Sequence, residues 1–482
     1  MEINKGQFLK KFIEYATGNF FALFLGFIAS PIITRLIMPE EMGKFSLFNT
    51  ITSVLFLFVM CGLDQSYVRF YNTLDSKGKR LLFNNCTIIS LLVGTGASVI
   101  IFFFYAPISK YICGQINFTV TFLLVVNIIS SILQRFALLE LRMGLRAKLY
   151  SLLNIWHKMS YILLVFGTYY FFKNDSCVLM IATVGSNFAC WIVCILFSRK
   201  TWMYFFSNMK IQQPTGHLLK FGFPFIFSNT INWIFEYIDR ISVKYYCDFN
   251  ELGIYSAAGT IVALLTACQL AFSTFWVPVA YEKYEKDPCC NSFFITMNRI
   301  VSFWMIVIAT LLITFKDLII ILLGPAYKNA MFIFPFLTYM PIMYTISETT
   351  VLGINFQMKT RYHIYIAILS AIVNLCGNTI LVPLLGAKGA AISTGFSYVV
   401  FFLIRTYLSN RCYPVKYKLK SLIVSLILLN ILTIYSSFNN VNIYSIALAC
   451  VVLIVVAVLY KDVIELTINY FKNFWLSFRE KE

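Results

Sequence analysis

Charged side chains are scarce in this sequence. They make up 12% of the 482 residues, whereas hydrophobic side chains make up 59%. A chain with so few charges cannot cover a water-soluble surface, and the composition is typical of a protein embedded in a lipid bilayer. We therefore exclude a soluble multidomain protein and predict an all-α integral membrane protein.

Histidine is rare as well, and long polar segments are missing. The histidines are His157, His217 and His363, and the thirteen cysteines do not have the spacing of a metal site. Membrane enzymes that use polyprenyl-linked sugars generally carry paired acids, histidine or a metal on a substantial loop or domain. The sequence therefore argues against an enzyme, and it predicts no cofactor apart from a coupling proton or Na⁺.

Acidic residues are outnumbered by basic ones, 21 to 39, which gives a net charge of +18. No basic stretch outside the apolar runs alternates with stacking aromatics, so nucleic acid is not an expected partner. Lys and Arg instead gather in alternate loops, as they do on the cytoplasmic side of membrane proteins. This pattern predicts a multi-pass protein of the cell membrane with both termini in the cytoplasm.

Apolar runs long enough to cross a bilayer as helices recur along the whole chain. They are continuous rather than alternating, which favours helices over barrel strands. We predict about fourteen spans, near 12–37, 45–69, 81–105, 117–139, 149–171, 177–198, 219–243, 251–278, 293–315, 331–353, 363–383, 390–408, 418–437 and 443–460.

An internal repeat divides the chain. Glu41–Ser46 (EMGKFS) and Glu251–Ser256 (ELGIYS) each open an even-numbered span, and they are 251 − 41 = 210 residues apart. We predict an N-terminal lobe over 1–210 and a C-terminal lobe over 211–410, each with six helices. Because six is even, a pseudo-two-fold along the membrane normal relates the lobes. Two extra helices and a cytoplasmic amphipathic tail fill 411–482.

Ionisable side chains inside the spans are candidate functional residues, because burying a charge in the bilayer costs several kcal/mol. Six lie well inside the predicted spans: Asp64, Arg135, Lys158, Glu236, Arg299 and Glu348. Arg135, Lys158 and Arg299 together would suit an anionic headgroup. The three acids would bind a coupling ion or pair with these cations.

Two further sets of charges have simpler interpretations. Glu236 and Arg240 are four residues apart with Asp239 beside Arg240, which predicts a local salt bridge or, for the three together, a role in gating or ion coupling. Arg35, Arg69 and Arg405 lie where long side chains reach the headgroups. Among the aromatic residues, Trp156, Trp233 and Trp276 are candidates for stacking on sugar.

Several motifs resemble the polysaccharide-transport family, which includes the Wzx-type oligosaccharide and O-antigen flippases of the multidrug/oligosaccharidyl-lipid/polysaccharide exporter superfamily. The resemblance covers nearly the whole chain. It rests on Arg35–Gly43, Gly62–Arg69, Leu219–Pro224 with Trp233, Asp239 and Arg240, Glu251–Ser256 and Gly386–Ala391. Arg35 and Arg69 match these motifs, either as substrate-binding residues or as contacts that close the lobes.

The resemblance implies a function. A flippase of this family moves a polyprenyl-pyrophosphate-linked oligosaccharide from the inner to the outer leaflet by alternating access, for capsule, exopolysaccharide or O-antigen synthesis. The glycan lipid, membrane lipids and the polysaccharide polymerase with its assembly machinery are the implied partners. A lipid II flippase and a cation-coupled multidrug antiporter of the same superfamily are the alternatives.

Overall fold

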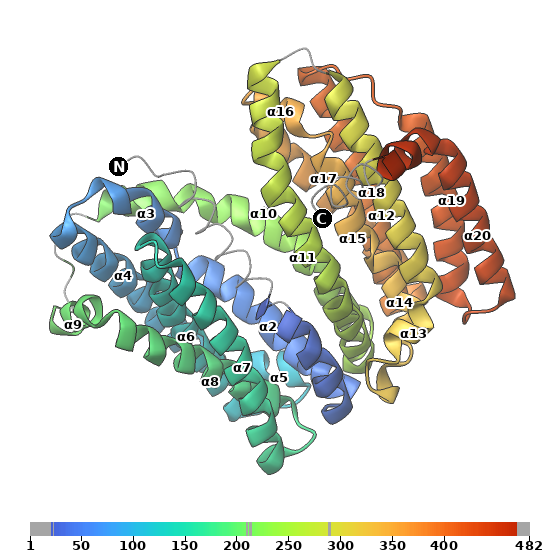
Figure 1. Ribbon diagram of the computed structural model, residues 1–482. Helices are drawn as coiled ribbons and strands as arrows, with labels where there is room; N and C mark the ends of the chain where they lie inside the picture. Colours follow the sequence, from blue (N-terminus) through green and yellow to red (C-terminus); the bar gives the residue numbers. More distant parts are fainter. Residues whose placement is uncertain (1–20, 23, 209–210, 212–214, 288–290, 470–482) are drawn as a thin grey trace, which may run out of the picture. The chain divides into compact units, whose positions relative to one another are not determined.

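The computed structural model describes the chain except residues 1–20, 23, 209–210, 212–214, 288–290 and 470–482. The start of the first predicted span and the part of the predicted tail beyond residue 469 lie outside the described residues. Within them the fold is all-helical, as predicted (Figure 1). By Cα packing the chain forms two compact units, Met1–Ala257 and Ala258–Glu482. The lobe boundary at 210 stays a prediction.

Unit 1 contains a helix over Phe24–Leu36 and, among the described residues after it, nine α-helices of different lengths. Their bounds are α2 Pro39–Val59, α3 Leu63–Phe70, α4 Ser76–Phe103, α5 Tyr105–Cys113, α6 Phe118–Met143, α7 Ala147–Phe172, α8 Ser176–Phe197, α9 Arg199–Ser207 and α10 Gly216–Tyr246, and the first turns of α11, Phe249–Lys286, also belong to this unit.

Unit 2 contains the rest of α11 and the helices that follow. Their bounds are α12 Asn291–Thr314, α13 Lys316–Ile320, α14 Ala330–Leu337, α15 Tyr339–Glu348, α16 Leu352–Phe356, α17 Arg361–Leu385, α18 Ala387–Cys412, α19 Leu419–Phe438 and α20 Ile443–Leu459. A helix of residues Lys461–Asn469 continues from α20 after a bend of 76°.

Ten helical segments in the described chain are long and apolar enough to cross a membrane, or eleven with the bent pair at α20. The protein is therefore a multi-pass membrane protein. Within the described residues each of the fourteen predicted ranges coincides with helix, but the number of spans stays a prediction. Two predicted spans are broken: 45–69 is divided into α2 and α3, and 331–353 into α14, α15 and α16.

Side-chain caps and buried rings fix the helices of unit 1. Asp75, Asn117 and Asp175 each accept a hydrogen bond from a backbone N–H in the first turn of the helix that follows. Short α9 packs by burying Trp202 and Phe205, and Trp202 meets Phe83 of α4 edge to face. The ends of several long helices are thereby held in one packed cluster.

Candidate functional site

The first candidate charges that the structure brings together are Asp64 and Arg135. Gly62, with a φ of 68°, ends the break after α2, so that Asp64 falls in the first turn of α3. Its Oδ2 lies 2.8 Å from Nη2 of Arg135 on α6. The Arg135 side chain is 42% exposed, and its Nε has no hydrogen-bond partner. A guanidinium held on one side by a carboxylate still offers donors to an anion.

Lys158 stands out among the candidate charges because it has no partner among the described residues. It lies on α7, within the predicted span 149–171, and the structure gives its ammonium no hydrogen bond or ion pair with any described residue. An ammonium in a membrane span normally pairs with a carboxylate or reaches the interface. Lys158 therefore stays a candidate for binding an anion.

The residue before Lys158 belongs to a polar network that joins four helices. His157 Nε2 lies 3.1 Å from Oδ1 of Asn187 on α8. Asn187 donates to Oδ1 of Asn127 on α6, and Asn127 donates to Oγ1 of Thr52 on α2. Buried amides need such partners, so the network fixes α7 against its neighbours at the level of Lys158.

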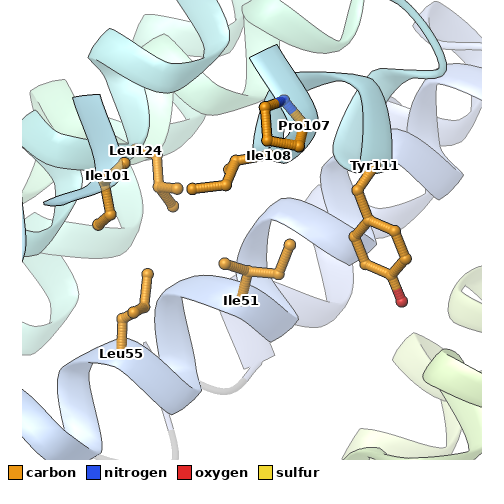
Figure 2. A pocket seen from close by; sticks show the side chains of 7 residues that line it. All are labelled: Ile51, Leu55, Ile101, Pro107, Ile108, Tyr111 and Leu124. Carbon is orange, nitrogen blue, oxygen red and sulfur yellow. The ribbon is translucent and has the colours of Figure 1, made fainter. Parts of the chain in front are cut away.

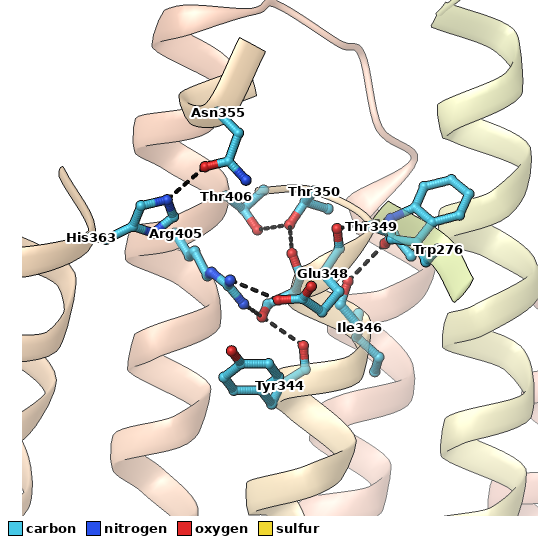
Figure 3. Close-up of polar contacts among 11 residues, drawn as sticks. Trp276, Tyr344, Ile346, Glu348, Thr349, Thr350, Asn355, His363, Arg405 and Thr406 are labelled. Carbon is cyan, nitrogen blue, oxygen red and sulfur yellow. Dashed lines mark hydrogen bonds and ion pairs between the residues drawn. The ribbon is translucent and has the colours of Figure 1, made fainter. Parts of the chain in front are cut away.

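Glu348 lies in unit 2, paired with Arg405. Glu348 is the last residue of α15, and its Oε1 lies 2.7 Å from Nη2 of Arg405 on α18, with both side chains buried (Figure 3). Arg405 also donates to Oγ of Ser347 and lies over the rings of Tyr344 and Phe401. The prediction that Arg405 reaches the headgroups is wrong, because the break of the span brings it a buried partner.

Side chains from other helices satisfy the backbone at this break. The indole of Trp276 donates to the Glu348 carbonyl, and Asn298 donates to Oγ1 of Thr349 (Figure 3 shows the first). Trp276 is fully buried and stacks between Phe272 and Phe293. A fully buried ring cannot stack on sugar, so that prediction for Trp276 is wrong.

Arg299 is paired within unit 2 as well. Its Nε donates to Oδ2 of Asp462 at 2.7 Å, Nη2 meets the other carboxylate oxygen, and Nη2 also donates to the Leu459 carbonyl. The guanidinium lies over Tyr460 and its side chain is 8% exposed. Arg299 therefore joins α12 to the bend after α20, with its donors largely occupied.

The remaining predicted residues lie apart from these pairs. Asp239 accepts from the hydroxyl of Tyr255, and Arg240 lies over Tyr237 instead of pairing with Glu236. The predicted local salt bridge is therefore wrong, although Glu236 is exposed and accessible. Arg35 and Arg69 are exposed, and the structure gives neither of them an ion pair within the described chain.

A backbone crossing in unit 1 relates residues by the offset of the repeat. A Cβ on Gly43 would lie 1.9 Å from the Phe249 carbonyl oxygen, and one on Gly253 would lie 1.7 Å from the Pro39 carbonyl oxygen. Nothing larger than glycine fits at either position. The hydroxyls of Ser46 and Ser256 lie 2.7 Å apart beside them. Gly43 thus meets Gly253 and Ser46 meets Ser256, each pair 210 apart. The contacts of residue 43 with 249 and of residue 253 with 39 are related by the same offset.

A second close approach lies at the other end of α2. A Cβ on Gly62 would lie 2.1 Å from the Gly222 carbonyl oxygen, and Ser66 donates to the Leu218 carbonyl at 2.7 Å. The segment from α2 to α3 is therefore held against residues after position 210 at both of its ends.

An apolar pocket of about 280 Å³ opens between α2, α4, α5 and α6 (Figure 2). The Tyr111 hydroxyl is the one polar side-chain group in its lining. Such a surface suits a hydrocarbon chain and, apart from the Tyr111 hydroxyl, offers no side-chain donor to a diphosphate or a sugar. The lining residues are Ile51, Leu55, Ile101, Pro107, Ile108, Tyr111 and Leu124.

Charges also link the loops of unit 2. Lys316 lies in the short α13 that follows α12, and it donates to Oδ1 of Asp317. Oδ2 of Asp317 accepts from the Val441 N–H in the α19–α20 loop. Burial lowers the pKa of the Lys316 ammonium, and the bond to Asp317 opposes that shift. The described residues contain no group of three or more His, Cys, Asp or Glu that could hold a metal ion.

The sequence did not reveal the partners of these charges. Asp462 follows the last span and had no signal beyond its acidity, and Arg405 was separated from Glu348 by a whole span. The polar network had a weak signal, since Asn127, Asn187 and His157 are among the few strongly polar residues within these apolar runs.

Comparison with known proteins places this geometry in a family. Over 424 residues the chain is 23% identical to an uncharacterized membrane protein of Methanocaldococcus jannaschii, covering 80% of this chain and 82% of that protein. The fold is similar to that of a lipid II flippase in an inward closed conformation, with a TM-score of 0.70 at 15% identity over 94% of this chain and 100% of the other.

It is also similar to a multidrug resistance transporter in an inward-facing conformation, with a TM-score of 0.56 at 14% identity over 82% of this chain and 94% of the other. At these identities the likeness concerns the fold alone. Residues 8–282 match the family model described as polysaccharide biosynthesis protein, which is more than half of the chain. The chain therefore belongs to the polysaccharide biosynthesis protein family, and it has the fold of the flippases and exporters.

Proposed function

We propose that the protein carries a polyprenyl-diphosphate-linked oligosaccharide from the inner to the outer leaflet of the cell membrane, with both of its termini in the cytoplasm. The observation that carries the proposal is Lys158, a cation in a span that lacks a partner in the described chain. An ammonium there attracts a diphosphate as a compact point charge.

Arg135 supports the same assignment. Its guanidinium is half-exposed and meets Asp64 through one nitrogen, so it can exchange part of that contact for phosphate oxygens. Nε and Nη2 of Arg299 are occupied by Asp462 and the Leu459 carbonyl. Arg299 would therefore bind the diphosphate together with Lys158 and Arg135 only by exchanging those contacts for phosphate oxygens. Arg35 and Arg69, both exposed, would meet the headgroup at the ends of its path.

The acidic candidates complete the proposal. Asp64 and Glu348 would couple transport to an ion by exchanging their arginine partners. Glu236, Asp239 and Arg240 would act in gating or coupling on α10. Polymerase and assembly proteins would receive the glycan on the outer side.

Alternating access requires the segment α2–α3 to release its contacts at one end at a time. The glycine crossing at Gly43 and Gly253 would close the outer end of the path, and the approach of Gly62 to Gly222 would close the inner end. Both approaches bring backbone against backbone, a contact that can separate and re-form without rearranging side chains.

The test uses right-side-out membrane vesicles with and without the protein. We measure the fraction of lipid-linked glycan that an impermeant sugar-modifying reagent reaches, and we expect this fraction to fall when the protein is depleted. An unchanged fraction would reject the glycan lipid as cargo and favour lipid or drug export through the same fold.

Lys158 is tested in the same vesicles. Lys158→Ala should slow flipping by about 10- to 100-fold, since one charge-assisted contact to an anion is worth about 1.5–3 kcal/mol, and Lys158→Arg should keep most of the activity. Lys173→Ala, an exposed lysine at the end of the same helix, is the matched control. Normal flipping by an abundant Lys158→Ala protein would refute the assignment.

A further inference from the structure

His157 is the titratable member of the polar network in unit 1, and the proposed function does not use it. Its Nε2 lies 3.1 Å from Asn187 Oδ1 and 3.3 Å from Ser186 Oγ. Ser186 donates its own proton to the Thr183 carbonyl, so its oxygen can only accept from the histidine.

The network also fixes the orientation of the Asn187 amide. Its Nδ2 faces three oxygens, those of Asn127, Ser130 and Ser131, so its Oδ1 is the atom turned toward His157. Both neighbours of Nε2 are therefore acceptors, and Nε2 carries a hydrogen. The ring can then gain or lose a proton only at Nδ1.

The four helices of the network bring no carboxylate to the middle of the span. The acids on α2, α6, α7 and α8 occupy end turns, and the cation beside His157 is Lys158. Arg135 on α6 is paired with Asp64. The charged residues and thiols on these helices are Glu40, Glu41, Lys44, Arg135, Glu140, Arg142, Lys148, Lys158, Cys177, Cys190 and Cys194, and the phenols on α7 are Tyr150, Tyr161, Tyr169 and Tyr170.

We propose that His157 is the proton-binding half of the diphosphate site: its Nδ1 takes up a proton from water when a diphosphate binds at Lys158, and loses it when the diphosphate leaves. The inference rests on the proposed function. While the site is empty, protonation of His157 would place a second positive charge next to the Lys158 ammonium, and the two charges would repel each other. A diphosphate brings at least two negative charges and removes that repulsion.

Linkage makes this coupling reciprocal. If the diphosphate favours the protonated ring, then protons favour binding of the diphosphate. The affinity should rise as the pH falls, by at most tenfold per pH unit for one proton. The neutral amides and hydroxyls around Nε2 would hold the ring in place in both states.

The test measures binding of farnesyl diphosphate to the purified full-length protein by titration calorimetry. Two buffers with different ionisation enthalpies at the same pH give the number of protons taken up. We compare the wild type with His157→Gln and with His363→Gln. His363 is the matched control, because its Nε2 also meets an asparagine oxygen, 2.7 Å away on Asn355, outside this network.

We expect His157→Gln to take up fewer protons than the wild type, by a fraction of one proton, and His363→Gln to match the wild type. The ionisation of the diphosphate itself is common to all three proteins. His157→Asn serves if the glutamine variant does not fold. Equal proton uptake by the wild type and both His157 variants would overturn this inference and leave the proposed function unaffected. Absence of binding by the wild type would overturn the proposed function and the inference with it.

Discussion

Glu348 and Arg405 show how this protein keeps charges inside a span. Both side chains are buried, and each satisfies the other within one unit. Removing one partner of a buried pair leaves the other charge without compensation, which costs about 3–5 kcal/mol.

We therefore expect Glu348→Gln and Arg405→Met each to lower the thermal unfolding midpoint of the purified protein strongly. The double substitution Glu348→Met with Arg405→Met should recover much of the loss, because it removes both charges. A double variant as unstable as the sum of the single ones would show that the pair contributes no coupling.

Asp64 and Arg135 should behave differently, since Arg135 is 42% exposed. Solvent screens such a pair, so Asp64→Asn should lower the free energy of unfolding by about 1 kcal/mol or less. Flipping in vesicles should change far more than stability if the guanidinium serves the headgroup. A loss of stability as large as that of Glu348→Gln would assign the pair a purely structural part.

The sequence identified the charged residues but not their partners. Position within an apolar run shows that a charge is buried in the membrane, and this placed Glu348 and Arg135 among the candidates. Pairing depends on which faces of separate helices meet, and no pattern along the chain reports this for Arg299 and Asp462.

At the scale of elements, the crossing of α2 and α11 was within reach of the sequence. The repeat placed Gly43 with Gly253 and Ser46 with Ser256, and the structure brings these pairs into contact. The breaks within the predicted spans 45–69 and 331–353 were missed, because each range was assigned as one span by its length, although the sequence becomes more polar after Gly62.

A disulfide across this crossing tests its part in transport. Ser46→Cys with Ser256→Cys should form a bond on oxidation, because the native hydroxyl oxygens lie 2.7 Å apart. The locked protein should lose flipping and regain it with a reductant. Each single-cysteine variant controls for the native thiols, and full activity of the crosslinked protein would exclude an opening at this point.

At the scale of the whole molecule, the hairpin of α19 and α20 is attached to unit 2 at both ends. Asp317 binds the loop between the two helices through the Val441 N–H, and Arg299 binds Asp462 after α20. The sequence placed this hairpin outside the repeat but could not show that it is fixed to α12 and α13.

Loss of these two contacts can be measured by hydrogen exchange of the backbone amides. Asp317→Asn should speed exchange of the amides near Val441 with a stability loss of about 1 kcal/mol or less. Asp462→Asn should speed exchange of the segment after Leu459 with a larger loss, about 1.5–3 kcal/mol, because it leaves the buried Arg299 guanidinium without its charged partner. Lys461→Gln, a charge change beside Asp462, is the control. Unchanged exchange in both variants would mean that packing alone holds the hairpin.

The crossing at Gly43 and Gly253 has the form of a contact between two copies of one chain. Position 43 meets position 249, and position 253 meets position 39. Since 249 − 210 = 39 and 253 − 210 = 43, both contacts join the same two positions of the repeat. This reciprocal pattern is that of a self-complementary dimer interface. The serine pair, 46 with 256, lies where the symmetry axis of such a dimer would run. If the two lobes are repeats, as predicted, this contact is one surface of the repeat bound to its own copy, so the same few residues supply both sides of it.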